Sequence, residues 1–257
     1  MRKLPPLSLS AKLGLFVLAI SVFPLTVAGL LSYHAARQVS EKQVVQYTEA
    51  MLAQQTDYLD VILRQIESLM GSVSGVDDIK SALDEEYDPG DDYRRLATQA
   101  EIGYTLNRFI NLEGLVGIDI FGNNGARYHV GDTLDSTEVN QSVLTALQAT
   151  ASTAQGRVVW PGVEDNVTVR SSHPKVLTAA KELTIVDPTT LEDRAVGLLL
   201  VHYSVERLYD YFSQIDGGLA GYMVIVDSQG RIIYHPDGAL IGQPINAALL
   251  AQWPGQS

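Results

Sequence analysis

The chain has 257 residues, of which 46% are hydrophobic and 19% are charged, and this is enough for one or two domains with buried cores. It contains no cysteine, which excludes disulfides, cysteine-ligated zinc and a thiol nucleophile. The formal net charge of −12 argues against a nucleic-acid partner, because binding to phosphates draws on clustered lysine and arginine.

Residues 13–33 form an uncharged apolar segment, LGLFVLAISVFPLTVAGLLSY. A helix of this length spans about 30 Å, the thickness of a bilayer core. Arg2, Lys3 and Lys12 precede it and no acidic residue lies within residues 1–33, so the positive-inside rule places the N-terminus in the cytoplasm and residues 34–257 outside. A cleaved signal peptide would have a shorter apolar core and a small-residue cleavage site. We therefore expect an uncleaved membrane anchor.

A long helix is predicted after the apolar segment, because residues 38–70 contain neither proline nor glycine. Mostly apolar residues recur there at alternating steps of three and four, the spacing of a heptad seam. The seam positions are Val45, Thr48, Leu52, Gln55, Leu59, Ile62, Ile66, Leu69 and Val73. Such a seam binds a second copy of itself, packs on the following domain, or does both in different stretches. Its length favours a parallel homodimer through a stalk at 34–76.

The body of the chain predicts mixed helices and strands. The first part predicts a helix at 77–86, an acidic loop, a helix at 92–112, a hairpin of strands 115–121 and 126–130 that turns at 123–125, and a helix at 137–151 capped by Ser136. The second part predicts strands at 157–160, 166–171, 176–186 and 195–203, a hairpin loop at 187–194, and a helix at 204–215 capped by Ser204. The helix at 92–112 is expected to turn Tyr93, Leu96, Leu106, Phe109 and Ile110 inward. An antiparallel sheet with helices beside it is an α+β domain.

No local motif predicts catalytic chemistry. The acidic stretch after residue 76 lacks the alternating ligands and the closing glutamate of a calcium loop. No two of the five histidines lie close enough in sequence to form a local metal pair. There is no phosphate loop and no dinucleotide fingerprint. We therefore expect no catalytic residue, no cofactor and no metal site.

Two segments follow one hairpin template of apolar strand, polar turn with glycine, and strand with tyrosine. They are GIDIFGNNGARYHV and YMVIVDSQGRIIYHP, about 100 residues apart, which suggests an internal duplication. The stretch VIVDSQGRIIYHPDGALIGQPI at 224–245 has an Asp-x-x-Gly turn, a Tyr-His-Pro strand end and a Leu-Ile-Gly-x-Pro closing. It resembles the opening of the membrane-proximal unit of a double Cache domain, a PAS-like extracytoplasmic sensor of bacterial transmembrane receptors.

The resemblance implies an organisation for the whole chain. The expected parts are a cytoplasmic N-terminus at 1–12, a transmembrane helix at 13–33, a stalk helix at 34–76, a membrane-distal PAS-like unit at 77–215 and the incomplete start of a membrane-proximal unit at 216–257. In this family the distal unit holds a small ligand against its sheet and signals to a cytoplasmic output module. The chain is then a non-enzymatic input region in a bacterial inner membrane, truncated before its output.

Several outputs remain open at this point. A diguanylate cyclase or a sensor histidine kinase is expected, with a methyl-accepting chemoreceptor as an alternative. A different class of function, an anchored structural or interaction protein that uses the dimer stalk, is the remaining alternative. An anchored extracytoplasmic enzyme would need a clustered nucleophile and base, which the sequence does not offer.

The resemblance also bears on the ligand. The amino-acid-binding branch of the family has an Arg-x-Trp-Tyr motif that this chain lacks, and His202 stands where that branch has an aspartate. We therefore do not expect amino-acid binding by that route. Candidate ligand contacts are polar or aromatic residues on the distal strands, namely Tyr128, Trp160, Arg170 and Lys181. They would suit a small carboxylate, which arginine can bind through two parallel hydrogen bonds. The structural alternatives are a packing anchor for Trp160, a surface ion pair for Arg170 and an exposed Lys181.

Overall fold

The computed structural model describes residues 9–85, 91–134, 136–187, 189–216 and 222–245. The chain divides into two compact units, one that ends at Leu59 and one that begins at Asp60. The elements in chain order are α1 (Leu9–Ser74), α2 (Asp77–Asp84), α3 (Asp92–Asn107), β1 (Leu115–Gly122), β2 (Arg127–Gly131), α4 (Gln141–Ser152), β3 (Val159–Asp165), β4 (Lys175–Val186), β5 (Asp193–Ser204), α5 (Val205–Asp216), β6 (Ile225–Val226), β7 (Ile232–Tyr234) and the 3-10 helix η1 (Gly238–Leu240).

The first unit consists of helix α1 as far as Leu59. The helix runs without a break from the predicted membrane segment into the predicted stalk. From Phe16 onward it is long and apolar enough to cross a membrane, with a window of 18 residues that has a mean hydropathy of 2.0 and no buried residue. A signal sequence near an N-terminus would meet the same criteria, so the uncleaved anchor stays a prediction. Pro24 lies inside the helix, as is tolerated in membrane helices.

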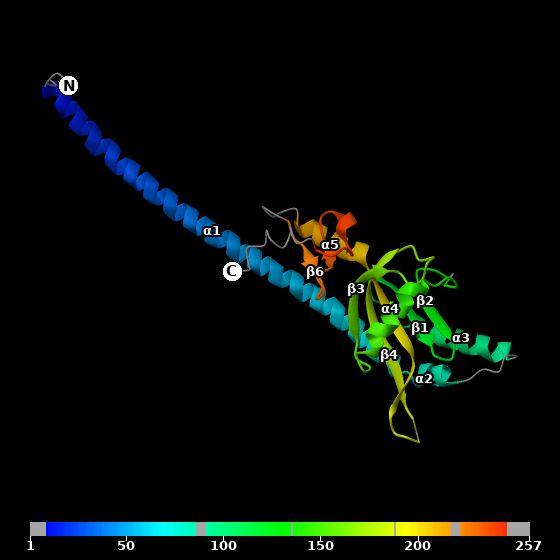
Figure 1. Ribbon diagram of the computed structural model, residues 1–257. Coiled ribbons are helices and arrows are strands. Elements are labelled where there is room, and N and C mark those ends of the chain that lie inside the picture. The colour runs from blue at the N-terminus through cyan, green and yellow to red at the C-terminus, as the bar shows by residue number, and fades with distance from the viewer. Residues whose placement is uncertain (1–8, 86–90, 135, 188, 217–221, 246–257) are drawn as a thin grey trace. The chain divides into compact units, whose positions relative to one another are not determined.

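The second unit is built on a five-stranded antiparallel sheet with the strand order β2-β1-β5-β4-β3 (Figure 1). The sheet and its flanking helices confirm the predicted α+β class. Strands β4 and β5 pair from Val176–Ser204 to Val186–Asp193, whereas β1 reaches β5 only as far as Gly197. The hairpin of β4 and β5 therefore continues as a two-stranded ribbon beyond the rest of the sheet (Figure 1).

The two faces of the sheet are covered by different helices. Helix α4 packs on one face, where Leu147 and Ala151 form a core cluster with Ala180, Leu198 and Leu200 of β4 and β5. Side chains alternate along a strand, so Lys181 points to the other face. Its ammonium donates to Ser74 at 2.9 Å, which brings the end of α1 to that face.

The seam of α1 is used differently along its length. Ile62, Ile66 and Val73, which lie in the second unit, are buried. Val45 and Leu52 in the first unit are 55% and 44% exposed. The seam thus packs into the core of the second unit at its C-terminal end, one of the two uses that the sequence left open.

The predicted strand at 166–171 is wrong. Residues 166–174 form a loop, and Thr168 makes only an isolated bridge to Val139. The cause is local: the Asn166 side chain accepts from the backbone N–H of Thr168 at 2.9 Å and donates to the carbonyl of His173 at 3.1 Å. Asparagine side chains that satisfy neighbouring backbone groups in this way compete with strand pairing.

Several predicted boundaries are also wrong. The predicted helix at 137–151 begins later, because Asn140, not Ser136, is the N-cap: its side chain accepts from the N–H of Val143. Strand β3 extends through Pro161, which an edge strand tolerates. Helix α3 ends at Asn107 and not at 112. Tyr93 and Leu96, predicted to point inward, are 86% and 60% exposed.

Other local predictions are confirmed. The turn at 123–125 joins β1 to β2, with Gly125 at φ +82°. Ser204 caps α5, since its hydroxyl accepts from the N–H of Arg207 at 3.0 Å. The predicted acidic loop falls mainly on residues 86–90, which lie outside the described residues, as do 217–221 and 246–257 of the predicted proximal unit.

The second predicted hairpin consists of β6 and β7, and it docks on β3 and α5. Arg231 lies between the carboxylates of Asp227, 2.9 Å away, and Glu164 of β3. Gly162 of β3 faces the same two groups, Asp227 and Arg231, at φ +97°. On the side of α5, Phe212 packs against Tyr234 with ring centroids 5.3 Å apart.

Candidate ligand-binding site

A cavity of about 630 Å³ runs along edge strand β2, between this strand, helix α3 and the loop after β2. This volume lies within the range of small-molecule sites. Its described lining residues are Gln99, Gly103, Tyr104 and Asn107 of α3, Arg127–Gly131 of β2, and Thr133, Leu134, Ser136 and Thr137 of the loop. Because β2 is an edge strand, the backbone groups on its outer side pair with no further strand of this sheet.

A buried charged cluster adjoins the cavity, and we call it the Asp119 cluster: Asp119 of β1, Arg127 and His129 of β2, and His202 of β5. Asp119 is fully buried. Its Oδ1 lies 3.0 Å from His129 Nδ1 and 3.2 Å from an Arg127 amino group, and its Oδ2 lies 3.5 Å from His202 Nε2. The strand register explains the grouping, since Asp119 pairs directly with His129 and His202 pairs with Gly117, two positions from Asp119.

The cluster is electrostatically coupled. Burial alone would raise the pKa of Asp119, but hydrogen bonds from His129 and His202 and their charges hold this pKa well below its usual value. For His129 burial acts against the charged form, yet the hydrogen bond to Asp119 and the charge of Asp119 raise the pKa above its usual value of 6.5. The carboxylate and the imidazolium therefore stabilise each other.

Arg127 links the Asp119 cluster to the cavity walls. Its two amino groups donate to the backbone carbonyl of Ser136, to Asp119 and, at 3.1 Å, to the hydroxyl of Thr168. Its Nε is buried with no hydrogen-bond partner among the described residues. Its guanidinium carbon lies 5.0 Å from the centre of the Phe121 ring. A second, smaller cavity of about 280 Å³ also has Arg127 in its lining, on the side of α4.

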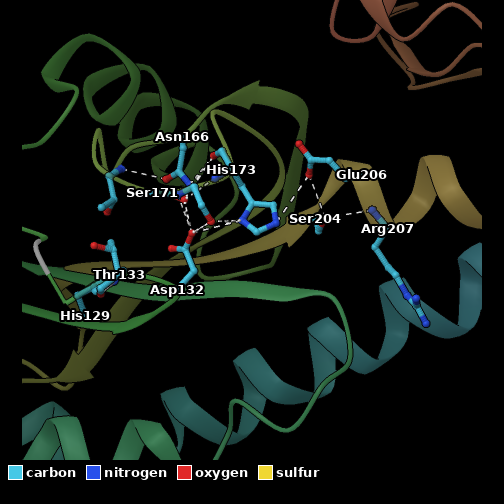
Figure 2. Close-up of polar contacts among 11 residues, drawn as sticks. His129, Asp132, Thr133, Asn166, Ser171, His173, Ser204, Glu206 and Arg207 are labelled. Carbon is cyan, nitrogen blue, oxygen red and sulfur yellow. Dashed lines mark hydrogen bonds and ion pairs between the residues drawn. The ribbon is translucent and has the colours of Figure 1, made fainter.

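A second polar cluster, centred on Asp132, fastens the end of β2 to the 166–174 loop (Figure 2). Asp132 Oδ2 accepts from the hydroxyls of Ser171 and Ser172 at 2.9 and 2.7 Å, and from the backbone N–H of Ser172 at 2.8 Å. These hydrogen bonds lower the pKa of Asp132 below its usual value although burial opposes this. His173 lies 3.3 Å from Asp132 and 3.9 Å from Glu206 at the start of α5.

The structure does not bring the four sequence-predicted ligand residues together. Tyr128 lines the 630 Å³ cavity. Trp160 donates to Glu67 at 3.0 Å and Lys181 to Ser74, so both contact the end of α1. Arg170 forms an ion pair with Glu138 and is 59% exposed. The ion pair of Arg170 corresponds to the surface alternative named for it, whereas Trp160 and Lys181 form hydrogen bonds to α1.

The sequence-based prediction missed the Asp119 cluster. A signal was present in GIDIF, where a charged residue interrupts an apolar strand, but strand pairing with distant residues is needed to see its partners. Arg127 and His129 flank Tyr128 in the sequence, and His202 was noted only as a departure from the amino-acid-binding motif.

Comparisons with known proteins locate the fold among sensor domains. No protein-family model and no curated protein matches the chain. Among solved structures, it is similar to the ligand-binding domain of the amino-acid chemoreceptor PctC of Pseudomonas aeruginosa PAO1 in complex with GABA, with a TM-score of 0.53, 15% identity and coverage of 81% of this chain and 83% of that one.

A second structure, the ligand-binding domain of the Campylobacter jejuni chemoreceptor Tlp3 in complex with L-valine, gives a TM-score of 0.45 at 15% identity, covering 79% of this chain and 78% of that one. This superposition is too loose to add to the argument. The first likeness shows the fold alone: the chain shares the fold of a chemoreceptor ligand-binding domain, as the sequence predicted.

Proposed function

We propose that the chain is the extracytoplasmic ligand-sensing region of a membrane-anchored bacterial receptor, and that its distal unit, residues 77–215, binds a small molecule. The observation that carries the proposal is the cavity beside β2, because a buried charged cluster adjoins it and polar groups of α3 and of the following loop line it. The chemoreceptor-type fold and the candidate membrane span of α1 support the same reading.

The proposal includes the organisation predicted from the sequence. The N-terminus is cytoplasmic, residues 13–33 cross the inner membrane, and the body lies in the periplasm. Residues 216–257 begin a membrane-proximal unit, and a diguanylate cyclase or histidine kinase output acts beyond this sequence. A chemoreceptor output is the alternative, and the likeness of the fold to a chemoreceptor domain supports it equally.

A route from the cavity to the proximal hairpin follows from the contacts. Closure of the loop after β2 over a ligand would move Asp132, which holds the 166–174 loop through Ser171 and Ser172. His173 of that loop faces Glu206 of α5, and α5 packs on β7. A ligand biases such a chain of contacts only through its different affinity for the two arrangements.

Among the sequence-predicted ligand residues, the proposal assigns direct contact to Tyr128, which lines the cavity. Trp160, Arg170 and Lys181 remain predicted ligand residues that only binding measurements on substituted chains can test. Their observed partners predict that alanine at these positions changes stability more than affinity.

The test is a thermal-shift screen of the full chain in lipid nanodiscs against organic acids, amino acids, amines, sugars and nucleosides. Specific binding to the folded state raises the midpoint in a saturable way, by RT ln(1 + [L]/Kd) in free energy. We expect at least one compound to do so, and Tyr128→Ala to weaken its effect while the exposed-site control Gln54→Ala leaves it unchanged. If no compound class gives a saturable shift, the sensing proposal fails.

A further inference from the structure

The Asp119 cluster holds more positive than negative charge. Asp119 is its one carboxylate, and Arg127 is a permanent cation. His129 is a second cation by geometry: Nδ1 faces the Asp119 carboxylate at 3.0 Å and Nε2 faces the carbonyl oxygen of Thr133 at 3.2 Å. Both partners only accept hydrogen bonds, so both contacts form only when both ring nitrogens carry a proton.

The third neighbour does not remove this excess. His202 Nδ1 lies 3.1 Å from the hydroxyl of Thr178, and His202 Nε2 lies 3.5 Å from Asp119 Oδ2. An imidazole ring is neutral or positive, so His202 adds no negative charge. Ser136, Thr168 and Thr133 offer these cations neutral acceptors but no negative charge, so an anion close by would still be favoured over water.

The cavity supplies no such anion from the part of the chain that the structure describes. Arg127 and His129 are both lining residues, while none of the described lining residues is an aspartate or a glutamate. The other lining side chains that can hydrogen-bond are neutral amides and hydroxyls, including Gln99, Asn107 and Tyr104. Asp135, in the same loop, lies outside the described residues.

From this distribution we infer that the cavity beside β2 binds a small anion that carries no ammonium group, with the anion held on the side of Arg127 and His129. The inference rests on the proposed sensing function and names its ligand class. An amino acid would bring an ammonium group to a wall that offers it no described carboxylate, and it would lose the solvation of that charge without compensation. Carboxylates and phosphate share the required chemistry.

The experiment compares matched ligands on the full chain in nanodiscs by isothermal titration calorimetry. Acetate, glycine and acetamide form one set, succinate, L-aspartate and succinamide form a second, and inorganic phosphate is measured alone. We expect the acid of at least one set to bind at least tenfold more tightly than the amino acid and the amide of that set, or phosphate to bind at least tenfold more tightly than every amino acid and amide in the two sets. Tighter binding of phosphate or of a carboxylate decides between these two sources of the anion.

Two isosteric variants test the location without disturbing the Asp119 cluster. Gln99→Glu and Asn107→Asp each add a carboxylate to the α3 wall of the cavity, and both should weaken anion binding by roughly tenfold. Gln54→Glu adds the same charge on the first unit of the chain and should leave the affinity unchanged. Both α3 variants keep the shape of the side chain, so loss of folding does not imitate the expected result.

The outcomes separate the two proposals. If glycine or L-aspartate binds as tightly as its acid, or if Gln99→Glu and Asn107→Asp leave anion affinity unchanged, the anion inference is overturned while the sensing function stands. The same holds if only sugars, amines or amides bind. If none of the matched ligands and no compound of the wider screen binds, both proposals fail.

Discussion

At the scale of single residues, the Asp119 cluster should make stability depend on pH in a defined direction. The pKa of His129 is raised above 6.5, so its contribution is complete below pH 6.5 and is lost as pH rises through the raised value. The pKa of Asp119 is lowered from 3.8, so its contribution is present above that pH and is lost in stronger acid. The contribution of this pair to the free energy of unfolding is therefore greatest between pH 3.8 and pH 6.5.

The measurement is denaturant unfolding of the full chain from pH 5 to pH 9. We expect the free energy of unfolding to fall above pH 6.5 by at most about 1.4 kcal/mol per pH unit, the slope for release of one proton. The groups that face His129 are Asp119, Arg127 and the backbone carbonyl of Thr133, and Asp119→Asn removes the carboxylate, which raises its pKa the most. An Asp119→Asn chain that keeps the wild-type slope above pH 6.5 would assign the dependence to another group.

A matched substitution separates the cluster from ordinary surface charge. Asp119→Asn leaves Arg127 and His129 without their carboxylate in a buried site, where breaking one partner of an ion pair costs about 3–5 kcal/mol. Glu138→Gln breaks an ion pair in which both side chains are more than half exposed, and such pairs contribute about 0–1 kcal/mol. The unfolding free energies of Asp119→Asn and Glu138→Gln are compared with that of the unchanged chain, by the same denaturant unfolding as in the pH series.

The sequence alone predicted one of the residues that line the candidate cavity. Tyr128 was predicted as a ligand contact because it lies on the second strand, and it does line the cavity. Arg127 and His129 next to it were not predicted, because their role depends on Asp119 and His202, which come from β1 and β5. The register between β1 and β5, which are about 80 residues apart in the sequence, is set by packing of the whole sheet. It cannot be predicted from the spacing of neighbouring residues.

At the scale of elements, the docking of the β6–β7 hairpin on β3 depends on one backbone position. Gly162 adopts φ +97°, and a Cβ there would overlap Asp227 and Arg231. Gly162→Ala therefore meets both a left-handed backbone, which costs about 1–3 kcal/mol in a side-chain-bearing residue, and a collision with the ion pairs of Arg231. We expect the hairpin to separate from β3 and its amides to exchange faster with deuterium.

The control for this substitution is Gly156→Ala, at φ +74° with no atom within 4 Å of the new Cβ. It has the same kind of backbone cost without the collision, so exchange in residues 225–234 should stay slow. Equal exchange in both variants would mean that backbone strain, and not the contact with Asp227 and Arg231, accounts for the effect.

Elements were predicted best where one local pattern decides them. The 115–130 hairpin and the Ser204 cap were confirmed because turn and cap chemistry are local. The strand predicted at 166–171 failed because β-branched residues favoured it while the Asn166 side chain engaged the backbone of Thr168 and His173 instead. A β-branched pattern therefore did not outweigh a nearby asparagine that could close a turn.

At the scale of the whole molecule, the seam of α1 explains why a heptad pattern alone did not decide between a dimer and a packed helix. Ile62, Ile66 and Val73 are used by the core of the second unit, so they are not available to a second chain. Val45 and Leu52 belong to the same seam and are exposed. If the chain forms a homodimer through its stalk, the contact must therefore lie in the earlier stretch.

Cysteine cross-linking in native membranes tests this division, since the chain has no cysteine of its own. A parallel dimer brings each seam position close to its own copy, so Val45→Cys and Leu52→Cys should each give a disulfide-linked dimer under mild oxidation. At 100° per residue Gln54 lies about 180° around the helix from Val45 and about 160° from Leu52, so Gln54→Cys should give little product. Ile62→Cys should also remain monomeric, because its side chain is 5% exposed in the single chain. Cross-linking at Gln54 equal to that at Val45 would indicate random collision in the membrane. Cross-linking at Ile62 would mean that the C-terminal seam leaves the core of its own second unit to meet the partner.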